Sequence, residues 1–320
     1  MNLSQKSTIY LLLMAISCSF YQLNAQDGRK IKFGLRAGTN ISTVFGPSEE
    51  GADEKYKVTA KIVAGALVKI PFNDRFGFMG EVDYIQKGTY HRFEATDSYL
   101  KLPGYGNQAE VTYQGNKDWK KIIGVNLINS YVEVPLLFYA QPIKDKLEFE
   151  VGPSFSFLVS SVGLGTLKYG ETLDNEIPDP SKFFEFDLDY KFFKDKVDEV
   201  GNDFAKSAKL NGSTRTYPQG PKAYYFQNYP ETATDPINPN DYTVKGSTTY
   251  SVFDIGINVG ASFFFTPGLR IGARANIGLI DISVDKYDIS NKELNTDGTF
   301  KLTNHFDQNF GVQIFVGLQF

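Results

Sequence analysis

The chain is poor in cysteine, tryptophan, methionine and histidine. Its 320 residues include one cysteine, Cys18, one tryptophan, three methionines and two histidines, His91 and His305. A single cysteine allows no disulfide within the chain and no thiolate cluster for a metal. Two histidines without regularly spaced partner ligands do not make a metal motif either. We therefore expect no metal and no cofactor.

Long apolar runs are also missing, because no segment approaches the 18 or so consecutive apolar residues that a membrane-spanning helix needs. The N-terminal run 9–16 is short, follows Lys6 and precedes the small-residue sequence Leu23-Asn24-Ala25. This pattern predicts a secretory signal peptide over residues 1–25 and a mature domain over residues 26–320.

One alternative for the N-terminus is a lipoprotein cut before Cys18, although residues 15–18 lack the leucine usually found three positions upstream of such a cysteine. The chain also has no excess of basic residues. Lysine and arginine number 33 against 37 aspartates and glutamates, and the formal net charge is −4. Nothing in this balance predicts a nucleic-acid partner.

The clearest positive signal is an alternation of apolar and polar residues between Tyr131 and Ser160. A period of two is typical of a β-strand. One face holds Val132, Val134, Leu136, Phe138 and Ala140 and, after a charged turn at 141–146, Leu147, Phe149, Val151, Pro153, Phe155, Phe157 and Val159. The other face holds Tyr131, Glu133, Pro135, Leu137 and Tyr139, followed by Glu148, Glu150, Gly152, Ser154, Ser156 and Ser160. This stretch predicts a long hairpin.

The alternating strands are longer than those of most globular proteins, which have about five to six residues. A tilted strand that crosses a bilayer has about 9–11 residues, apolar toward lipid and polar toward the lumen. Eight segments fit this description: 32–42, 58–70, 76–87, 131–140, 147–160, 251–265, 269–282 and 306–320.

The connections between these strands are short after the second, fourth and sixth strands and long after the first, third, fifth and seventh. We therefore predict an all-β fold, an eight-stranded antiparallel transmembrane β-barrel with short periplasmic turns and long extracellular loops. This makes the protein integral to a bacterial outer membrane, with outer-membrane lipid around it. The long third connection spans 91–125, and the largest insertion spans about 163–250.

Charged residues occupy many of the inward-facing positions. An eight-stranded barrel has room inside only for side chains, so these charges must pair across the lumen. We predict a closed lumen sealed by ion pairs, with an ion- or solute-conducting lumen as the alternative. The network comprises Arg36, Lys61, Lys69, Glu81, Asp83, Glu133, Glu148, Glu150, Asp254, Arg270 and Arg274, and Lys87 faces the same way.

The large insertion has two parts of different composition. Residues 191–209 resemble a short amphipathic helix, and the proline-rich residues 217–242 predict no regular structure. Exposed loop aromatics bind partners at low entropic cost. The candidate contacts for an unidentified protein or glycan partner are Phe183, Phe184, Phe186, Tyr224, Tyr225 and Phe226.

Signals for an enzyme are weak. His91 and His305 fall near predicted extracellular strand ends, where some barrel enzymes place a catalytic histidine, but no nucleophile motif accompanies them. The acidic segment 235–241 lacks the spacing of a calcium loop and is better interpreted as a proline-rich turn. We expect no enzymatic activity.

Several motifs resemble the PorT-like outer-membrane β-barrel proteins of Bacteroidota. They are residues 33–40 (FGLRAGTN), 131–137 (YVEVPLL), 151–155 (VGPSF), and 254–256 (DIG) with the strand 270–282. The resemblance implies an outer-membrane barrel, and its namesake member implies a role beside gliding and type IX secretion machinery. The terminal Phe320 also resembles the signal that barrel-assembly machinery recognises during insertion.

Two classes of function follow from these observations. The first is a non-enzymatic structural or interaction protein that presents extracellular loops, as an accessory to envelope or secretion machinery. The alternative is a small-solute or ligand-binding transport barrel, of which a soluble calycin-like barrel is a variant. The soluble variant would place phenylalanine and valine inside and charge outside.

Overall fold

The computed structural model describes residues 31–96, 98–102, 111–114, 119–172, 178–191, 205–210, 213–218, 250–284, 289–296, 300–303 and 305–320. Within these ranges every helix-or-strand element is a β-strand. None of the described segments is a helix long and apolar enough to cross a membrane. The predicted signal peptide lies outside the described residues.

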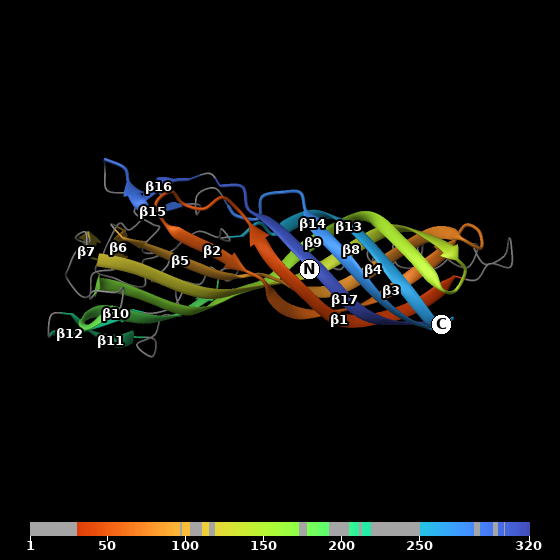
Figure 1. Ribbon diagram of the computed structural model, residues 1–320, viewed down its shortest axis with the longest axis horizontal. Coiled ribbons are helices and arrows are strands. Elements are labelled where there is room, and N and C mark those ends of the chain that lie inside the picture. The colour runs from red at the N-terminus through yellow and green to blue at the C-terminus, as the bar shows by residue number, and fades with distance from the viewer. Residues whose placement is uncertain are drawn as a thin grey trace, which may run out of the picture.

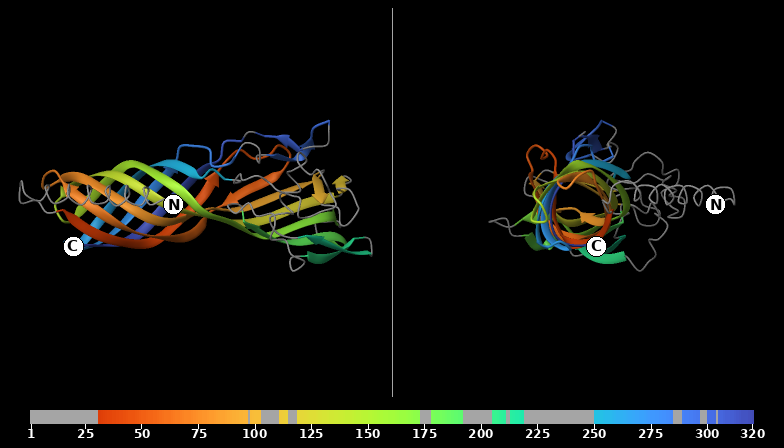
Figure 2. Two further views of the ribbon diagram at one scale, coloured as in Figure 1. Left: turned by 180° about the vertical axis from the view of Figure 1, so that it is seen from behind. Right: turned by 90° about the vertical axis from the view of Figure 1, so that its right-hand side faces the viewer.

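Eight antiparallel strands form a closed ring (Figures 1 and 2). Their order is β9-β13-β14-β17-β1-β3-β4-β8, and the pairing of β8 with β9 closes the ring. The strands are β1 (Lys32–Phe45), β3 (Thr59–Pro71), β4 (Phe76–Lys87), β8 (Trp119–Ile143), β9 (Leu147–Thr172), β13 (Phe253–Thr266), β14 (Leu269–Gly278) and β17 (Gln308–Gln319). The predicted eight-stranded barrel is confirmed.

The first and last strands of the chain pair with each other from Gly34↔Gln319 to Phe45↔Gln308. Beyond this ladder, the amide of Phe33 donates to the carbonyl of Phe320 at 3.0 Å, and the amide of Phe320 returns a bond at 2.9 Å. Ring closure matters because an unpaired backbone N–H or C=O in hydrocarbon costs several kcal/mol.

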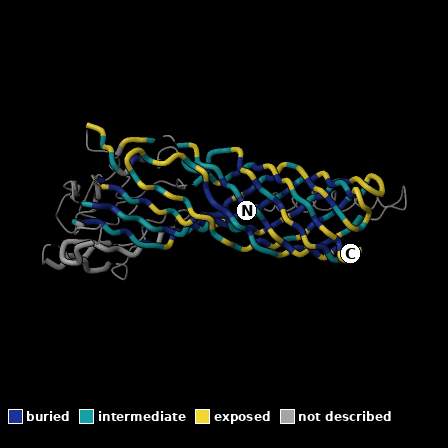
Figure 3. The backbone as a smooth tube through the Cα atoms, in the orientation of Figure 1, coloured by how far each residue is buried: buried dark blue, intermediate teal, exposed yellow. Residues whose placement is uncertain are grey.

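Buried and more exposed residues alternate along most of each ring strand, as the colours of Figure 3 show. Leu35 is 54% exposed, whereas its neighbour Arg36 is 3% exposed. Ile257 is 41% exposed, whereas Asn258 is fully buried. The polar face therefore points inward, which is the reverse of a soluble barrel.

The short-turn end of the ring is built by compact connections. In the turn between β3 and β4, the Asn73 side-chain oxygen accepts bonds from the amides of Arg75 and Phe76, both at 2.8 Å. In the β8–β9 turn, Asp145 adopts a φ of 53°, a left-handed conformation that aspartate tolerates better than most residues. The other end, where the long connections lie, is the loop end.

At the loop end, β8 and β9 continue far past the ring and carry a second, open sheet. Its strand order is β10-β9-β8-β5-β2, with β10 (Pro178–Lys191), β5 (Tyr90–Thr96) and β2 (Asp53–Lys57). We call this the projecting sheet: β2, β5, β10, residues 119–130 of β8 and 160–172 of β9. Figure 1 shows it extending from one side of the ring.

Three small hairpins accompany the projecting sheet. They are β6 (Tyr99–Leu102) with β7 (Val111–Gln114), β11 (Ala205–Leu210) with β12 (Ser213–Pro218), and β15 (Ile289–Leu294) with β16 (Phe300–Leu302).

Three sequence predictions at the loop end were wrong. Residues 91–125 contain strands rather than only a loop, and β9 runs to Thr172 instead of ending before 163. The helix predicted over 191–209 also fails where it can be compared, because Lys191 ends β10 and Ala205–Leu210 form β11. Residues 192–204 lie outside the described residues. Pairing with a neighbouring strand overrode local propensity at these positions: β5 pairs with β8, β10 with β9, and β11 with β12.

The predicted inward position of Ser160 was also wrong. Ser130 pairs with Ser160 and Tyr131 pairs with Leu158, so Val159 is an extra residue in β9. Such a bulge shifts the side-chain alternation by one residue. Val159 and Ser160 are consequently both exposed, while Leu158 and Ser161 are buried.

We expect Ile257→Arg to destabilise the protein in lipid vesicles by about 2–4 kcal/mol, because the charge would enter the middle of the apolar belt. The free energy of unfolding can be measured by urea titration followed by far-ultraviolet circular dichroism. Ile257→Val is the matched control and should cost no more than about 1.5 kcal/mol. Equal losses for the two variants would show that this face does not contact lipid.

Candidate functional site

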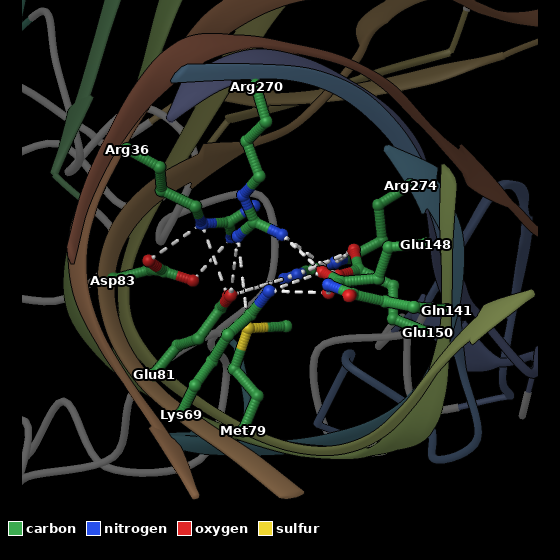
Figure 4. A network of polar contacts seen from close by, with 10 residues as sticks. All are labelled: Arg36, Lys69, Met79, Glu81, Asp83, Gln141, Glu148, Glu150, Arg270 and Arg274. Carbon is green, nitrogen blue, oxygen red and sulfur yellow. Dashed lines mark hydrogen bonds and ion pairs between the residues drawn. The ribbon is translucent and has the colours of Figure 1, made fainter. Parts of the chain in front are cut away.

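The lumen of the ring is filled by charged side chains that converge from different strands (Figure 4). Toward the short-turn end, the ammonium of Lys69 donates to both carboxylate oxygens of Glu148, at 2.6 and 2.5 Å. Arg270 donates to Glu148 at 2.8 Å, and Gln141 donates to its second oxygen at 2.8 Å. Glu148 is thus the common acceptor of two cations and one amide.

The centre of the lumen is organised around Arg274. Its guanidinium donates to Glu81 at 2.6 Å and to Glu150 at 2.8 Å. On the opposite side, Arg36 pairs with Asp83 and lies 3.2 Å from Glu81. Gly65 provides space here, since a Cβ at that position would lie 1.9 Å from an Asp83 oxygen.

A third group lies nearer the loop end. The ammonium of Lys87 lies 2.8 Å from Glu133 and 3.3 Å from Asp254. Ser156 donates to Glu133 at 2.9 Å, and Asn309 donates to Asp254 at 3.0 Å. Ser156 and Asn309 each add one neutral hydrogen bond to these carboxylates, while Glu133 Oε1 and Asp254 Oδ1 stay buried without a hydrogen bond among the described residues.

The ion-paired groups nearly balance in charge. Five cations, Arg36, Lys69, Lys87, Arg270 and Arg274, face six carboxylates, Glu81, Asp83, Glu133, Glu148, Glu150 and Asp254. Each of these residues is at most 3% exposed. An isolated buried ion would be prohibitive, so the pairs are mutually dependent.

Lys61, predicted as part of this network, lies apart from it. The residue is half-buried, and its ammonium donates to the side chain of Asn126 at 3.0 Å. No ion pair involves Lys61 among the described residues. It lies near the start of β3 at the loop end, beyond the level at which β3 and β4 pair.

Sequence reasoning missed an aromatic side chain at the centre of the lumen. The ring of Phe315 is 1% exposed, and the guanidinium carbons of Arg36, Arg270 and Arg274 lie 4.9, 5.4 and 5.6 Å from its centroid. Such cation–π contacts stabilise desolvated cations. The signal was available, because position 315 falls in the inward alternation of its strand.

Two apolar clusters lie at different heights inside the ring. Toward the loop end, Val63, Ile85, Tyr131 and Leu158 pack together with Tyr250. Toward the short-turn end, Leu67, Met79, Leu137 and Tyr139 form the second cluster. Both clusters border the ion pairs, since the ammonium of Lys69 lies 4.8 Å from the ring centroid of Tyr139 and that of Lys87 lies 5.2 Å from the ring centroid of Tyr131.

Three of the six predicted partner-binding aromatics lie in a strand and not in a loop. Phe183, Phe184 and Phe186 belong to β10, in register with Gly170, Tyr169 and Leu167 of β9. Tyr224, Tyr225 and Phe226 lie outside the described residues, as does the acidic segment 235–241. Phe320 is 76% exposed at the short-turn end.

The projecting sheet has its own apolar inner face. Phe93, Val125, Leu167 and Tyr169 are each at most 3% exposed. Tyr169 donates its hydroxyl to the carbonyl of Ser98 at 3.1 Å. Each large apolar side chain buried in this way stabilises the fold by about 1.5–3 kcal/mol. The sheet is therefore a packed extension of the barrel.

Glu54, Tyr56 and His91 form a polar cluster at the edge of this inner face. Glu54 accepts a bond from the His91 ring at 2.7 Å and from the Tyr56 hydroxyl at 3.1 Å. The His91 and Tyr56 rings stack with centroids 4.8 Å apart. Burial raises the pKa of Glu54, but these bonds and the Glu49 amide outweigh it and hold the pKa below its ordinary value.

His91 thus lies in a strand and not in a loop as predicted. The described residues contain no cluster of three or more histidine, cysteine, aspartate or glutamate side chains that could hold a metal ion.

We expect Arg274→Met to destabilise the barrel by about 3–5 kcal/mol, because Glu81 and Glu150 would remain buried without their main cation. Adding Glu150→Gln should recover part of this loss, since it removes one uncompensated charge. Urea unfolding in vesicles measures both. The control is Arg75→Met, at an exposed turn position, which should change stability by less than about 0.5 kcal/mol. If Arg274→Met costs no more than Arg75→Met, the network is not structural.

Comparisons with solved structures return small outer-membrane barrels. The attachment invasion locus protein Ail of Yersinia pestis is 11% identical, with 91% of this chain and 100% of that chain covered and a TM-score of 0.31. Neisserial surface protein A is 9% identical, with 91% and 100% covered and a TM-score of 0.33. OprG of Pseudomonas aeruginosa is 10% identical, with 90% and 95% covered and a TM-score of 0.26. Likeness at this level carries no argument about function.

No curated protein matches this chain. A family model described as an outer membrane protein beta-barrel domain matches residues 20–284, which is most of the chain. The closed ring, its apolar outer face and this match agree with one another. The chain belongs to the family of outer membrane protein beta-barrel domains and is an integral protein of the bacterial outer membrane.

Proposed function

We propose that the protein is a non-enzymatic anchor and interaction protein, in which a sealed barrel holds the projecting sheet at the cell surface for a protein or glycan partner. The observation that carries this proposal is the continuity of β8 and β9. Each strand runs from the barrel wall into the projecting sheet without interruption. The sheet therefore takes its position from the rigid ring.

The filled lumen favours an anchoring role and argues against a channel. At the level of Arg274, four strands contribute ionised groups that contact one another directly: β4, β9, β14 and, through Arg36, β1. Opening a path for solutes would require breaking several buried ion pairs at once. Removing one partner of such a pair typically costs about 3–5 kcal/mol.

The remaining parts of the proposal rest on sequence. Residues 1–25 would be a signal peptide, and residues 26–320 would form one domain with a large extracellular insertion. The motifs shared with PorT-like barrels of Bacteroidota favour an accessory role in envelope or secretion machinery, and Phe320 would be read by barrel-assembly machinery. In β10, Phe183, Phe184 and Phe186 would contribute to partner recognition.

Conductance distinguishes this proposal from a small-solute transport barrel. The purified protein in planar bilayers should show no steady single-channel currents at neutral pH, because ion pairs block the lumen. Insertion must be verified in the same preparation by protease protection. Reproducible unitary currents from inserted protein would overturn the sealed-lumen proposal and favour transport.

Cell-surface display can be tested by cysteine labelling. A cysteine at Arg92, whose side chain is 45% exposed on the outer face of the projecting sheet, should react with an impermeant maleimide on intact cells. A cysteine at Asp74, 77% exposed in a short turn, should react only after the outer membrane is permeabilised. The opposite pattern would place the projecting sheet in the periplasm.

A further inference from the structure

The connection between β1 and β2 contacts the β15–β16 hairpin through one carboxylate. An oxygen of Glu49 accepts a hydrogen bond from the hydroxyl of Ser290 and another, at 3.0 Å, from the backbone amide of Lys292. The residues are 241 and 243 positions apart in the chain. The contact therefore joins two separate connections at the loop end.

A second bond runs in the opposite direction. The ammonium of Lys292 donates to the carbonyl of Gly51 at 2.9 Å. Gly51 has a φ of +73°, a backbone conformation that would be strained in a residue with a side chain. The chain turns into β2 at this glycine. The hydroxyl of Ser290 also accepts bonds from the amides of Lys292 and Glu293, at 3.0 and 2.9 Å. Both sides of the contact are thus locally ordered.

The connection carrying Glu49 is itself attached to the projecting sheet. The amide of Glu49 donates to Glu54 at 2.9 Å, and Glu54 in turn binds His91 of β5. A continuous series of bonds therefore leads from β5 through β2 and the 46–52 connection to β15. Figure 1 shows β15 and β16 next to β2 at the loop end.

The charge of Glu49 also acts on the projecting sheet directly. Lys121, on the part of β8 beyond the ring, is fully buried. Burial lowers the pKa of Lys121 to about 8, and the Glu49 carboxylate opposes this by favouring the charged lysine. Neutralising Glu49 would therefore leave Lys121 in a less favourable environment.

We propose that Glu49 is a clasp that holds the β15–β16 hairpin against the projecting sheet, and that its release lets the hairpin move while the barrel stays folded. The hairpin lies between β14 and β17 in the chain, and β15 pairs only with β16 among the described strands. Its position depends on side-chain contacts, of which the Glu49 bonds are charge-assisted and hence the strongest kind. If the projecting sheet presents a partner site as proposed above, the clasp sets whether the hairpin lies beside that site.

The clasp can be tested without any partner by hydrogen exchange of the protein in lipid vesicles, followed by mass spectrometry. Glu49→Ala should accelerate exchange in peptides covering 289–294 by about tenfold or more, as expected for the loss of hydrogen bonds to a charged group. Peptides from β13 and β14 should exchange as in the unchanged protein. Glu50→Ala is the matched control, because Glu50 is the next residue and is exposed.

Ser290→Ala removes the other end of the same bond, but it also removes the local bonds of the Lys292 and Glu293 amides, so faster exchange over 289–294 is expected of it in any case. If Glu49→Ala does not assemble into membranes, the deciding readout for Ser290→Ala is therefore exchange in peptides covering 46–52, across the contact, which the clasp predicts to accelerate. Unchanged exchange over 289–294 in assembled Glu49→Ala, unchanged exchange over 46–52 in Ser290→Ala, or equal acceleration by Glu50→Ala would overturn the clasp. Because no partner is present, failure here leaves the anchor function untouched, whereas channel currents would overturn the sealed anchor and leave the clasp intact.

Discussion

Pairing of every backbone polar group inside the bilayer is the constraint on which this structure depends. Hydrocarbon offers no hydrogen bonds, so the sheet must form a closed ring, in which the first strand β1 pairs with the last strand β17. Closure creates an outside and an inside with different solvents. Apolar side chains such as Leu35 and Ile257 meet lipid, and every alternate residue is forced into a narrow lumen.

The interior of the barrel is packed mainly by ion-paired side chains and not by apolar ones alone. Arg274 joins Glu81 to Glu150, the Phe315 ring lies within 5.6 Å of three guanidinium groups, and one apolar cluster lies toward each end of the ring. Such a core is intolerant of single changes, because each removed charge leaves a buried partner behind. It provides rigidity, and the function proposed above assigns recognition to the loop end.

At the loop end, water again satisfies backbone groups, so an open sheet is allowed. The strands β8 and β9 use this freedom to continue into the projecting sheet, where Phe93, Leu167 and Tyr169 form an apolar inner face. The polar bonds of Glu54 and Glu49 then fix the neighbouring connections to it. A rigid barrel that holds a projecting sheet, with neighbouring connections bonded to that sheet, is consistent with the proposed anchoring and interaction role.

The sequence by itself determined the eight ring strands and the direction of their faces, because a period of two at fixed length records which side meets lipid. It identified Arg36, Glu148 and Arg274 as inward, since alternation assigns a face to each residue. Only the tertiary structure decided which charges pair, why Ser160 turns outward, and that β8 and β9 continue past the ring. Those features depend on register, a bulge and contacts between residues far apart in the chain, such as Glu49 and Ser290, which local periodicity does not encode.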